Sequence, residues 1–319
     1  MLKQLFLFSS LFLSFTSFSQ DKQSHWLNEL IAVQIDAKEH VFIGSSEIHE
    51  AQWDTLQQPR FWQEIMLLSP DSVLVNSAST RTIVGKYAYK DWMSQSEIQK
   101  KKVKDSLRFA FGIDSTETLN VTTGKNDFYR FDLVFSSLPE GVLTFEEYGV
   151  DPWYAQSILL IESPGKIAKS SVGAYGPFQL MPGVARAYGL KVSKSLDERK
   201  DFKRSAYAAS QLISKVCIPS AKAIAKSAGL EPDEQAIWFR LLTMHVYHAG
   251  SGNVKAVVNA CGEVDCGEEL IQKMWQTKAA SFGNSSQNYS QLTLAAHLQL
   301  EELIHQKELV IYKCPTKID

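Results

Sequence analysis

The sequence predicts a mainly helical fold that follows a smaller region of mixed helix and strand. The first observation behind this expectation is a change in the residue pattern at about residue 136. Before it, aromatic-rich stretches such as 60–62 alternate with strand-like pieces such as 72–76, whereas one helical pattern follows another after it. The second is the length of 319 residues, which suggests about two folding units. We therefore expect an N-terminal region over residues 20–135 and a helical domain over residues 136–312.

The clearest helix begins at Asp151-Pro152, because Asp is a favoured N-cap and Pro fits the first helical turn. It continues as an apolar run to Ile161 and ends at Glu162. Apolar residues at helical spacing predict three further helices, which cover residues 202–216, 232–246 and 290–306. The region after residue 136 is therefore expected to be mostly helical.

The bulk composition is that of an ordinary globular protein. Hydrophobic residues make up 45% of the chain and charged residues 21%, so the chain can bury a core and is not disordered by composition. The formal net charge of −2 gives no reason to expect a nucleic-acid partner.

The first nineteen residues resemble a cleavable signal peptide. Lys3 supplies a positive start, residues 5–15 are apolar, and residues 17–19 place small side chains before a cut at Gln20. A short membrane anchor is the alternative, but the apolar run falls well below the roughly 20 residues that span a bilayer. No cysteine near the cut could receive a lipid. We expect a periplasmic or secreted protein without a stable membrane anchor.

The four cysteines all lie in the second half of the chain, and four cysteines allow three pairings. An exported chain favours disulfides, so we expect Cys261 to pair with Cys266 across residues 262–265. Cys217 and Cys314 would form the second bridge. A zinc site is the alternative, but the spacing lacks paired CxxC motifs and no histidine completes a ligand set. We therefore predict no metal.

Three segments carry candidate chemistry, and the first is the end of the helix that begins at Asp151. Glu162 follows a strongly apolar run, which predicts a carboxyl group partly withdrawn from water. Desolvation disfavours the ionised form and raises the pKa, as suits a general acid. For this residue taken alone, a surface glutamate that caps the helix would be the commoner explanation.

The other two segments are residues 173–182 and 247–254. The first holds two glycines and two prolines, which suit a tight turn close to a ligand, with Gln179 as donor and acceptor. The same segment can also pack Phe178 into the core. In the second, Tyr247 is a candidate to hydrogen-bond an active-site carboxyl, whereas His248 is either catalytic or structural.

Together these segments resemble the catalytic domain of the soluble-lytic-transglycosylase (SLT) family, most closely the membrane-bound lytic transglycosylase D-like branch. The resemblance covers about residues 136–305. It rests on the order and spacing of Glu162-Ser163, of Ser170-x-x-Gly173-Ala174-x-Gly176-x-x-Gln179-Leu180-Met181-Pro182, and of Tyr247-x-Ala249-Gly250-x-Gly252-Asn253-Val254. It implies a lysozyme-like, mainly α fold with a substrate groove. By position, Glu162 would be the catalytic acid/base, and the substrate-binding residues would be Ser163, Ser170, Gln179, Met181, Tyr247, His248 and Tyr289.

The family implies an activity without a cofactor on glycan strands of peptidoglycan. Its members cleave the β-1,4 bond between N-acetylmuramic acid and N-acetylglucosamine without water, and they leave a 1,6-anhydro end. A single carboxyl group serves as acid and then as base, whereas most glycosidases use two. Asp197 and Glu198 are the nearest matched acids, and we interpret them as a helix entry.

The sequence also departs from the family pattern. The segment between Glu162 and Gly173 is about one residue shorter than usual, and His248 stands where the family usually has Asn. No wall-binding LysM-like repeat follows the catalytic region. These departures keep two alternatives open: an inactive peptidoglycan-binding or assembly-scaffold protein, and a lysozyme-type hydrolase. Residues 20–135 have no assigned role. They could bind a cell-envelope protein or shape one end of the groove, or their aromatic residues could belong only to the hydrophobic core.

Overall fold

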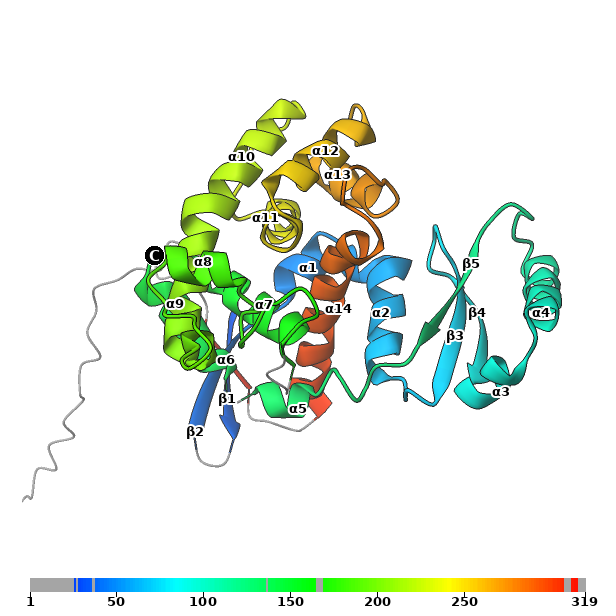
Figure 1. The fold of residues 1–319 in the computed structure, drawn as a ribbon, viewed down its shortest axis with the longest axis horizontal. Helices are drawn as coiled ribbons and strands as arrows, with labels where there is room; N and C mark the ends of the chain where they lie inside the picture. Colours follow the sequence, from blue (N-terminus) through cyan, green and yellow to red (C-terminus); the bar gives the residue numbers. More distant parts are fainter. Residues whose placement is uncertain are drawn as a thin grey trace, which may run out of the picture.

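A computed structural model describes residue 26 and residues 28–35, 38–135, 137–164, 169–306 and 311–314. The predicted signal peptide over residues 1–19 lies outside the described residues. Within the described part, no helix has the length and apolar character that a membrane crossing requires. The fold is mainly helical with two small sheets, as predicted (Figure 1).

The first sheet joins the two ends of the described chain. Its strand order is β2-β1-β6, and both pairings are antiparallel. The central strand β1 pairs with its neighbour β2 and with the last strand, β6, whose Cys314 lies opposite Leu30. The strands are β1 (Leu30–Ile35), β2 (Lys38–Ile43) and β6 (Ile311–Cys314). Three short elements follow β2: α1 (Ser46–Glu50), η1 (Trp53–Thr55) and α2 (Gln57–Leu67).

The second sheet belongs to a lobe that we call the strand module (residues 72–123). Its antiparallel strands have the order β4-β3-β5. Val73, Val75, Val84, Trp92 and Leu119 form a small core of their own, separate from the main core. Figure 1 shows the module beyond α2, at the right. Its elements are β3 (Ser72–Ser77), β4 (Ile83–Ala88), α3 (Tyr89–Ser94), α4 (Glu97–Ala110) and β5 (Leu119–Thr123).

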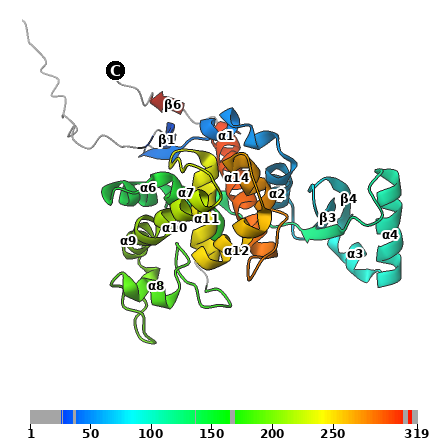
Figure 2. The same ribbon diagram turned by 90° about the horizontal axis from the view of Figure 1, so that it is seen from above.

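The helical part surrounds α7 (Pro152–Glu162), which packs on α6 (Leu138–Glu147) and α14 (Asn284–Gln306). Figure 2 shows α7 between α6 and the pair α11 and α14. The remaining elements are α5 (Phe131–Val134), α8 (Pro182–Ala187), η2 (Glu198–Lys200), α9 (Phe202–Leu212), a π-helical turn η3 (Ile213–Cys217), α10 (Ile218–Ser227), α11 (Ile237–Ala249), α12 (Ser251–Cys261) and α13 (Gly267–Met274).

Helix α7 is buried around its whole circumference. The Asp151 side chain caps it by accepting a hydrogen bond from the Trp153 N–H at 3.0 Å, as the sequence predicted. Gln156, fully buried, exchanges two hydrogen bonds with the backbone of Ile43 in β2, at 2.8 and 2.9 Å. All its residues up to position 161 are buried, and Glu162 is the first to reach solvent. An apolar helix of this kind forms the centre of a core rather than its surface.

A buried charge network fixes the start of α7. The Arg240 guanidinium donates to Asp151 Oδ2 at 2.8 Å and to Asn28 Oδ1 at 2.9 Å, and it also contacts the Glu47 carboxylate. Asn28 in turn donates to Asp151 Oδ1 at 2.8 Å. Arg240 and Asp151 have at most 1% exposure, so each ion depends on the other for compensation.

The cysteine pairing predicted from the sequence is wrong for the described thiols, since Cys217, Cys261 and Cys266 are free. Cys261 ends α12, is half-buried and hydrogen-bonds Thr277, whereas Cys266 is the exposed N-cap residue of α13 and its side chain makes no capping hydrogen bond. Cys217 is buried, and its surroundings raise the pKa of the thiol to about 12. Its predicted partner Cys314 lies in β6, and its side chain falls outside the described part.

We predict that Arg240→Leu lowers the free energy of unfolding by about 3–5 kcal/mol, because it leaves the Asp151 carboxylate buried without a counter-ion. Urea denaturation at neutral pH would measure the loss. Lys226→Leu is the control, since Lys226 is exposed and lies 3.9 Å from Glu231; removing such a pair costs about 1 kcal/mol or less. Equal effects of the two substitutions would contradict the role of the buried network.

Candidate active site

Glu162 is held at the boundary between the core and a cleft. As the last residue of α7 it follows the buried Ile161, and its own side chain is half-buried. The Tyr289 hydroxyl, on α14, donates to Glu162 Oε1 at 2.8 Å. Burial raises the pKa of the Glu162 carboxyl, and the bond from Tyr289 opposes this rise without cancelling it. The site therefore favours a protonated carboxylic acid over a range of pH where an exposed glutamate is ionised.

Two rings from α11 lie beside this carboxyl but do not hydrogen-bond it. His248 stacks on Tyr289 with ring centroids 4.2 Å apart, and the surrounding protein lowers the pKa of the imidazole to about 4. The imidazole is therefore neutral at pH 7 and adds no positive charge that would lower the pKa of Glu162. The Tyr247 hydroxyl instead donates to the Phe178 carbonyl at 2.5 Å. The bond to the carboxyl that we expected from Tyr247 is thus made by Tyr289.

The predicted turn over residues 173–182 is attached to the end of α7. The Gly176 carbonyl accepts from the Ser163 hydroxyl at 3.3 Å and from the Gln179 amide at 3.0 Å. Gly176 has φ +88°, and a Cβ there would lie 1.9 Å from the Arg199 carbonyl oxygen, so only glycine fits. Gln179 itself has φ +45°, in the left-handed region.

The Arg199 side chain fixes the conformation of this turn through hydrogen bonds to its backbone carbonyls. Its side chain is 2% exposed and donates to the carbonyls of Gly173 and Leu180, both at 2.8 Å. The Asp197 carboxylate forms an ion pair with the Arg199 guanidinium at 2.7 Å. Asp197 is also the N-cap of η2, which agrees with its interpretation as a helix entry. Sequence reasoning missed Arg199, because nothing in a charged surface-like cluster distinguishes the one side chain that turns inward.

The other two predicted residues in this region shape the loop and its exit. Ser170 exchanges backbone and side-chain hydrogen bonds with Ala174, each at 2.9 Å. Met181 precedes α8 as its N-cap and is 42% exposed. Both lie on the turn that Arg199 supports rather than in contact with Glu162.

The cleft has a volume of about 1070 Å³ and opens between the helical part and the strand module. Of the predicted site residues, Glu162, His248 and Tyr289 line it, while Ser163, Ser170, Gln179, Met181 and Tyr247 do not. One wall comes from α14 and the segment before it. The opposite wall comes from the module and the segment after it, with lining residues that include Arg81, Glu117, Asn120, Thr122, Lys125 and Phe128. Sequence reasoning left the role of this region open, since no local pattern shows which distant helix it faces.

Only one of the two carboxyl groups that line this cleft favours protonation. Glu117 accepts hydrogen bonds from the Ser77 hydroxyl at 2.6 Å and from the Ser79 N–H at 2.9 Å. Burial by itself would raise its pKa, but these hydrogen bonds outweigh burial and lower the pKa. No carboxylate among the described residues contributes to the pKa of Glu162. Glu162 is therefore the acidic group suited to donate a proton.

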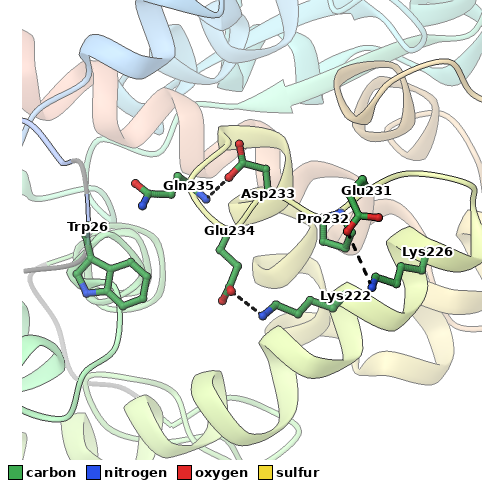
Figure 3. A pocket seen from close by; sticks show the side chains of 8 residues that line it. All are labelled: Trp26, Lys222, Lys226, Glu231, Pro232, Asp233, Glu234 and Gln235. Carbon is green, nitrogen blue, oxygen red and sulfur yellow. Dashed lines mark hydrogen bonds and ion pairs between the residues drawn. The ribbon is translucent and has the colours of Figure 1, made fainter.

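A second hollow, of about 610 Å³, lies beside Trp26 and the loop between α10 and α11 (Figure 3). Both of its lysines are paired with carboxylates, with Lys222 2.5 Å from Glu234 and Lys226 3.9 Å from Glu231. These pairs resemble a solvated surface rather than a catalytic centre. Across the described part of the chain, no cluster of three or more His, Cys, Asp or Glu side chains could hold a metal ion.

We predict that Glu162→Gln stabilises the fold at neutral pH. In the wild type the raised pKa means that folding disfavours the ionised carboxylate, a cost that is absent below the unfolded pKa of about 4.3 and complete above the folded pKa. Urea denaturation should therefore give equal stabilities near about pH 4 and a more stable variant at about pH 7. A less stable variant at neutral pH would contradict the burial of the charge.

We also predict that Tyr289→Phe raises the pKa of Glu162 further, because the Tyr289 hydroxyl stabilises the ionised form. Carbon-13 NMR titration of glutamate side chains would measure it. Tyr247→Phe is the matched control, since its hydroxyl bonds the Phe178 carbonyl instead, and it should move the pKa less. A pKa that falls in Tyr289→Phe would exclude this role of the hydroxyl.

Comparison with known protein families gives a match, which covers part of this chain. Residues 144–265 match the family model described as Transglycosylase SLT domain. No curated protein matches the chain significantly. The matched residues hold Glu162, Gln179, Tyr247 and His248, whereas Tyr289 and the strand module lie outside them. The matched residues lie in the helical part of the chain, which has a lysozyme-like, α-rich fold and is similar to transglycosylase SLT domains.

Proposed function

We propose that the protein is a peptidoglycan lytic transglycosylase in which Glu162 is the single general acid and base. The bond cleaved would be the β-1,4 linkage from N-acetylmuramic acid to N-acetylglucosamine, and the product would carry a 1,6-anhydro end. The observation that carries this proposal is one half-buried carboxyl with a raised pKa, which a tyrosine hydroxyl contacts in a cleft of a family-matched domain.

The first step needs a proton at neutral pH. Burial of Glu162 keeps its carboxyl protonated beyond the range of an exposed glutamate, so it can protonate the leaving O4 oxygen as the bond from C1 to O4 breaks. The N-acetyl carbonyl of the substrate can stabilise the positive charge that develops at C1, as in substrate-assisted glycosidases. The neutral His248 beside Tyr289 leaves this proton on Glu162.

The second step returns the proton to the same carboxyl. Glu162, now ionised and stabilised by the Tyr289 hydroxyl, accepts the proton of the 6-hydroxyl while O6 attacks C1. The proton that Glu162 takes from O6 thus replaces the one that it gave to O4, and no water is consumed. The other acid of the cleft, Glu117, is bound by Ser77 and Ser79 and supplies no proton in this scheme.

Export would bring the enzyme to this substrate, because peptidoglycan lies outside the cytoplasm. The amino-terminal segment with Lys3 and the apolar residues 5–15 supports this part of the proposal. The mature protein would then act on glycan strands in the periplasm or beyond it.

Glu162→Gln should reduce turnover of purified sacculi by about 100-fold or more, because it keeps the side-chain shape and removes the transferable proton. Mass spectrometry of the released muropeptides should show anhydro ends from the wild type. Products about 18 Da heavier, with reducing ends, would instead identify a lysozyme-type hydrolase.

Glu117→Gln is the matched control, since it removes the other carboxyl of the same cleft and should leave turnover within a few-fold of the wild type. Sacculi that the wild type binds without releasing any product would favour a wall-binding or scaffold protein. Unreduced turnover in Glu162→Gln would refute the acid/base assignment.

A further inference from the structure

Arg81 lies in the turn between β3 and β4 and faces the helical part of the protein. Its side chain is 7% exposed, and Nη2 donates to Asn288 Oδ1 on α14 at 2.6 Å. The guanidinium also lies over the rings of Phe61 and Trp62, at 5.5 and 5.8 Å from their centroids. Helix α2, helix α14 and the strand module therefore all contribute to its position.

This buried cation has no carboxylate partner among the described residues. Arg199 and Arg240, the other buried arginines, each form an ion pair, whereas Arg81 forms none. Burial alone lowers the pKa of its guanidinium. A buried charge without a counter-ion costs stability, and titratable groups perturbed by burial cluster at functional sites.

Arg81 also lines the cleft that contains Glu162. Its backbone has φ +64°, a left-handed conformation that is unfavourable for a long side chain and that is often found at binding sites. Its partner Asn288 immediately precedes Tyr289, the donor to Glu162. The cation and the acid thus contact neighbouring residues of one helix.

We propose that Arg81 forms a carboxylate-binding subsite on the strand-module side of the cleft, which recognises a carboxylate carried by the glycan substrate. A guanidinium binds a planar carboxylate through two parallel hydrogen bonds, and the nitrogens that Asn288 does not use are available for it. Lys125 and Lys278, both exposed, line the same cleft and add positive charge around it. The proposal rests on the proposed function for the identity of the glycan.

The carboxylate could come from two parts of peptidoglycan: the peptide stem, or the lactyl group of muramic acid once the stem is removed. Both sources offer the same planar anion to Arg81. Oligomers of N-acetylglucosamine have a related backbone without any carboxylate. Three ligands of equal sugar number therefore separate the sources: glycan with stems, glycan stripped by an amidase, and the neutral oligomer.

The experiment measures dissociation constants for these three ligands by calorimetry in full-length Glu162→Gln protein, which does not consume them. Adding Arg81→Gln should weaken binding of the carboxylate-bearing glycan about tenfold or more, as expected for a charge-assisted hydrogen bond, and should leave the neutral oligomer unchanged. Weakening of the stem-bearing ligand alone would identify the stem, and weakening of the stripped glycan alone would identify the lactyl group, whose carboxyl is an amide while the stem is attached. Weakening of both would show that Arg81 accepts either carboxylate. Arg60→Gln, an exposed arginine outside the cleft, should change none of them.

Arg81→Lys should retain part of the preference, because it keeps the charge and loses the two-pronged geometry. Equal weakening of all three ligands by Arg81→Gln would overturn the proposal, and so would no weakening at all. If Arg81→Gln fails to fold, the stem-bearing and the stripped glycans with their carboxyls methyl-esterified replace the variant, and undiminished binding of both to the Glu162→Gln protein overturns the proposal. Sacculi left intact by the wild type would refute the proposed activity without altering this binding test.

Discussion

The desolvation of one carboxyl group is the constraint on which the rest of the site depends. Helix α7 is buried up to position 161, so its last residue emerges where the core meets the cleft. That placement raises the pKa of Glu162 without help from a second acid. The position of Glu162 is fixed because hydrogen bonds among Asp151, Arg240 and Asn28 anchor the first turn of α7. Asp151 lies eleven residues before the acid on the same helix. Loss of packing anywhere along α7 would admit water and let the carboxyl return to an ordinary acidity.

The turn next to Glu162 is shaped mainly by hydrogen bonds to backbone carbonyls. Arg199 holds Gly173 and Leu180, while Ser163 and Gln179 share the carbonyl of Gly176. These hydrogen bonds depend on the length of each donor side chain and little on the identity of the neighbouring residues. The sequence of the turn can therefore vary between the bonded carbonyls while its backbone conformation is kept.

Local chemistry made part of this site predictable. An N-cap Asp, a proline at the first turn and an unbroken apolar run located α7 and its final glutamate, and glycine and proline located the turn. The sequence could not choose between Tyr247 and Tyr289, because the direction of each hydroxyl depends on how α11 and α14 pack. Arg81 and Asn288 lie 207 positions apart, so no local signal connects them. The cysteine prediction failed because spacing ignores burial, which turned Cys261 inward and left Cys266 in solvent.

The chain before the family-matched residues is structurally inseparable from them. Gln156 of α7 is bound to Ile43, and Trp62 of α2 donates to Gln291 of α14 at 3.1 Å, within one apolar core that runs from Ile31 to Ile304. Strand β1 also pairs with β6 at the far end of the chain. The leading segment is therefore packed into the same core and is unlike a domain on a linker. A shortened gene that kept only the matched residues would yield a chain without α14 and its Tyr289, which would retain only Ile161, Glu162 and His248 of the residues that line the cleft.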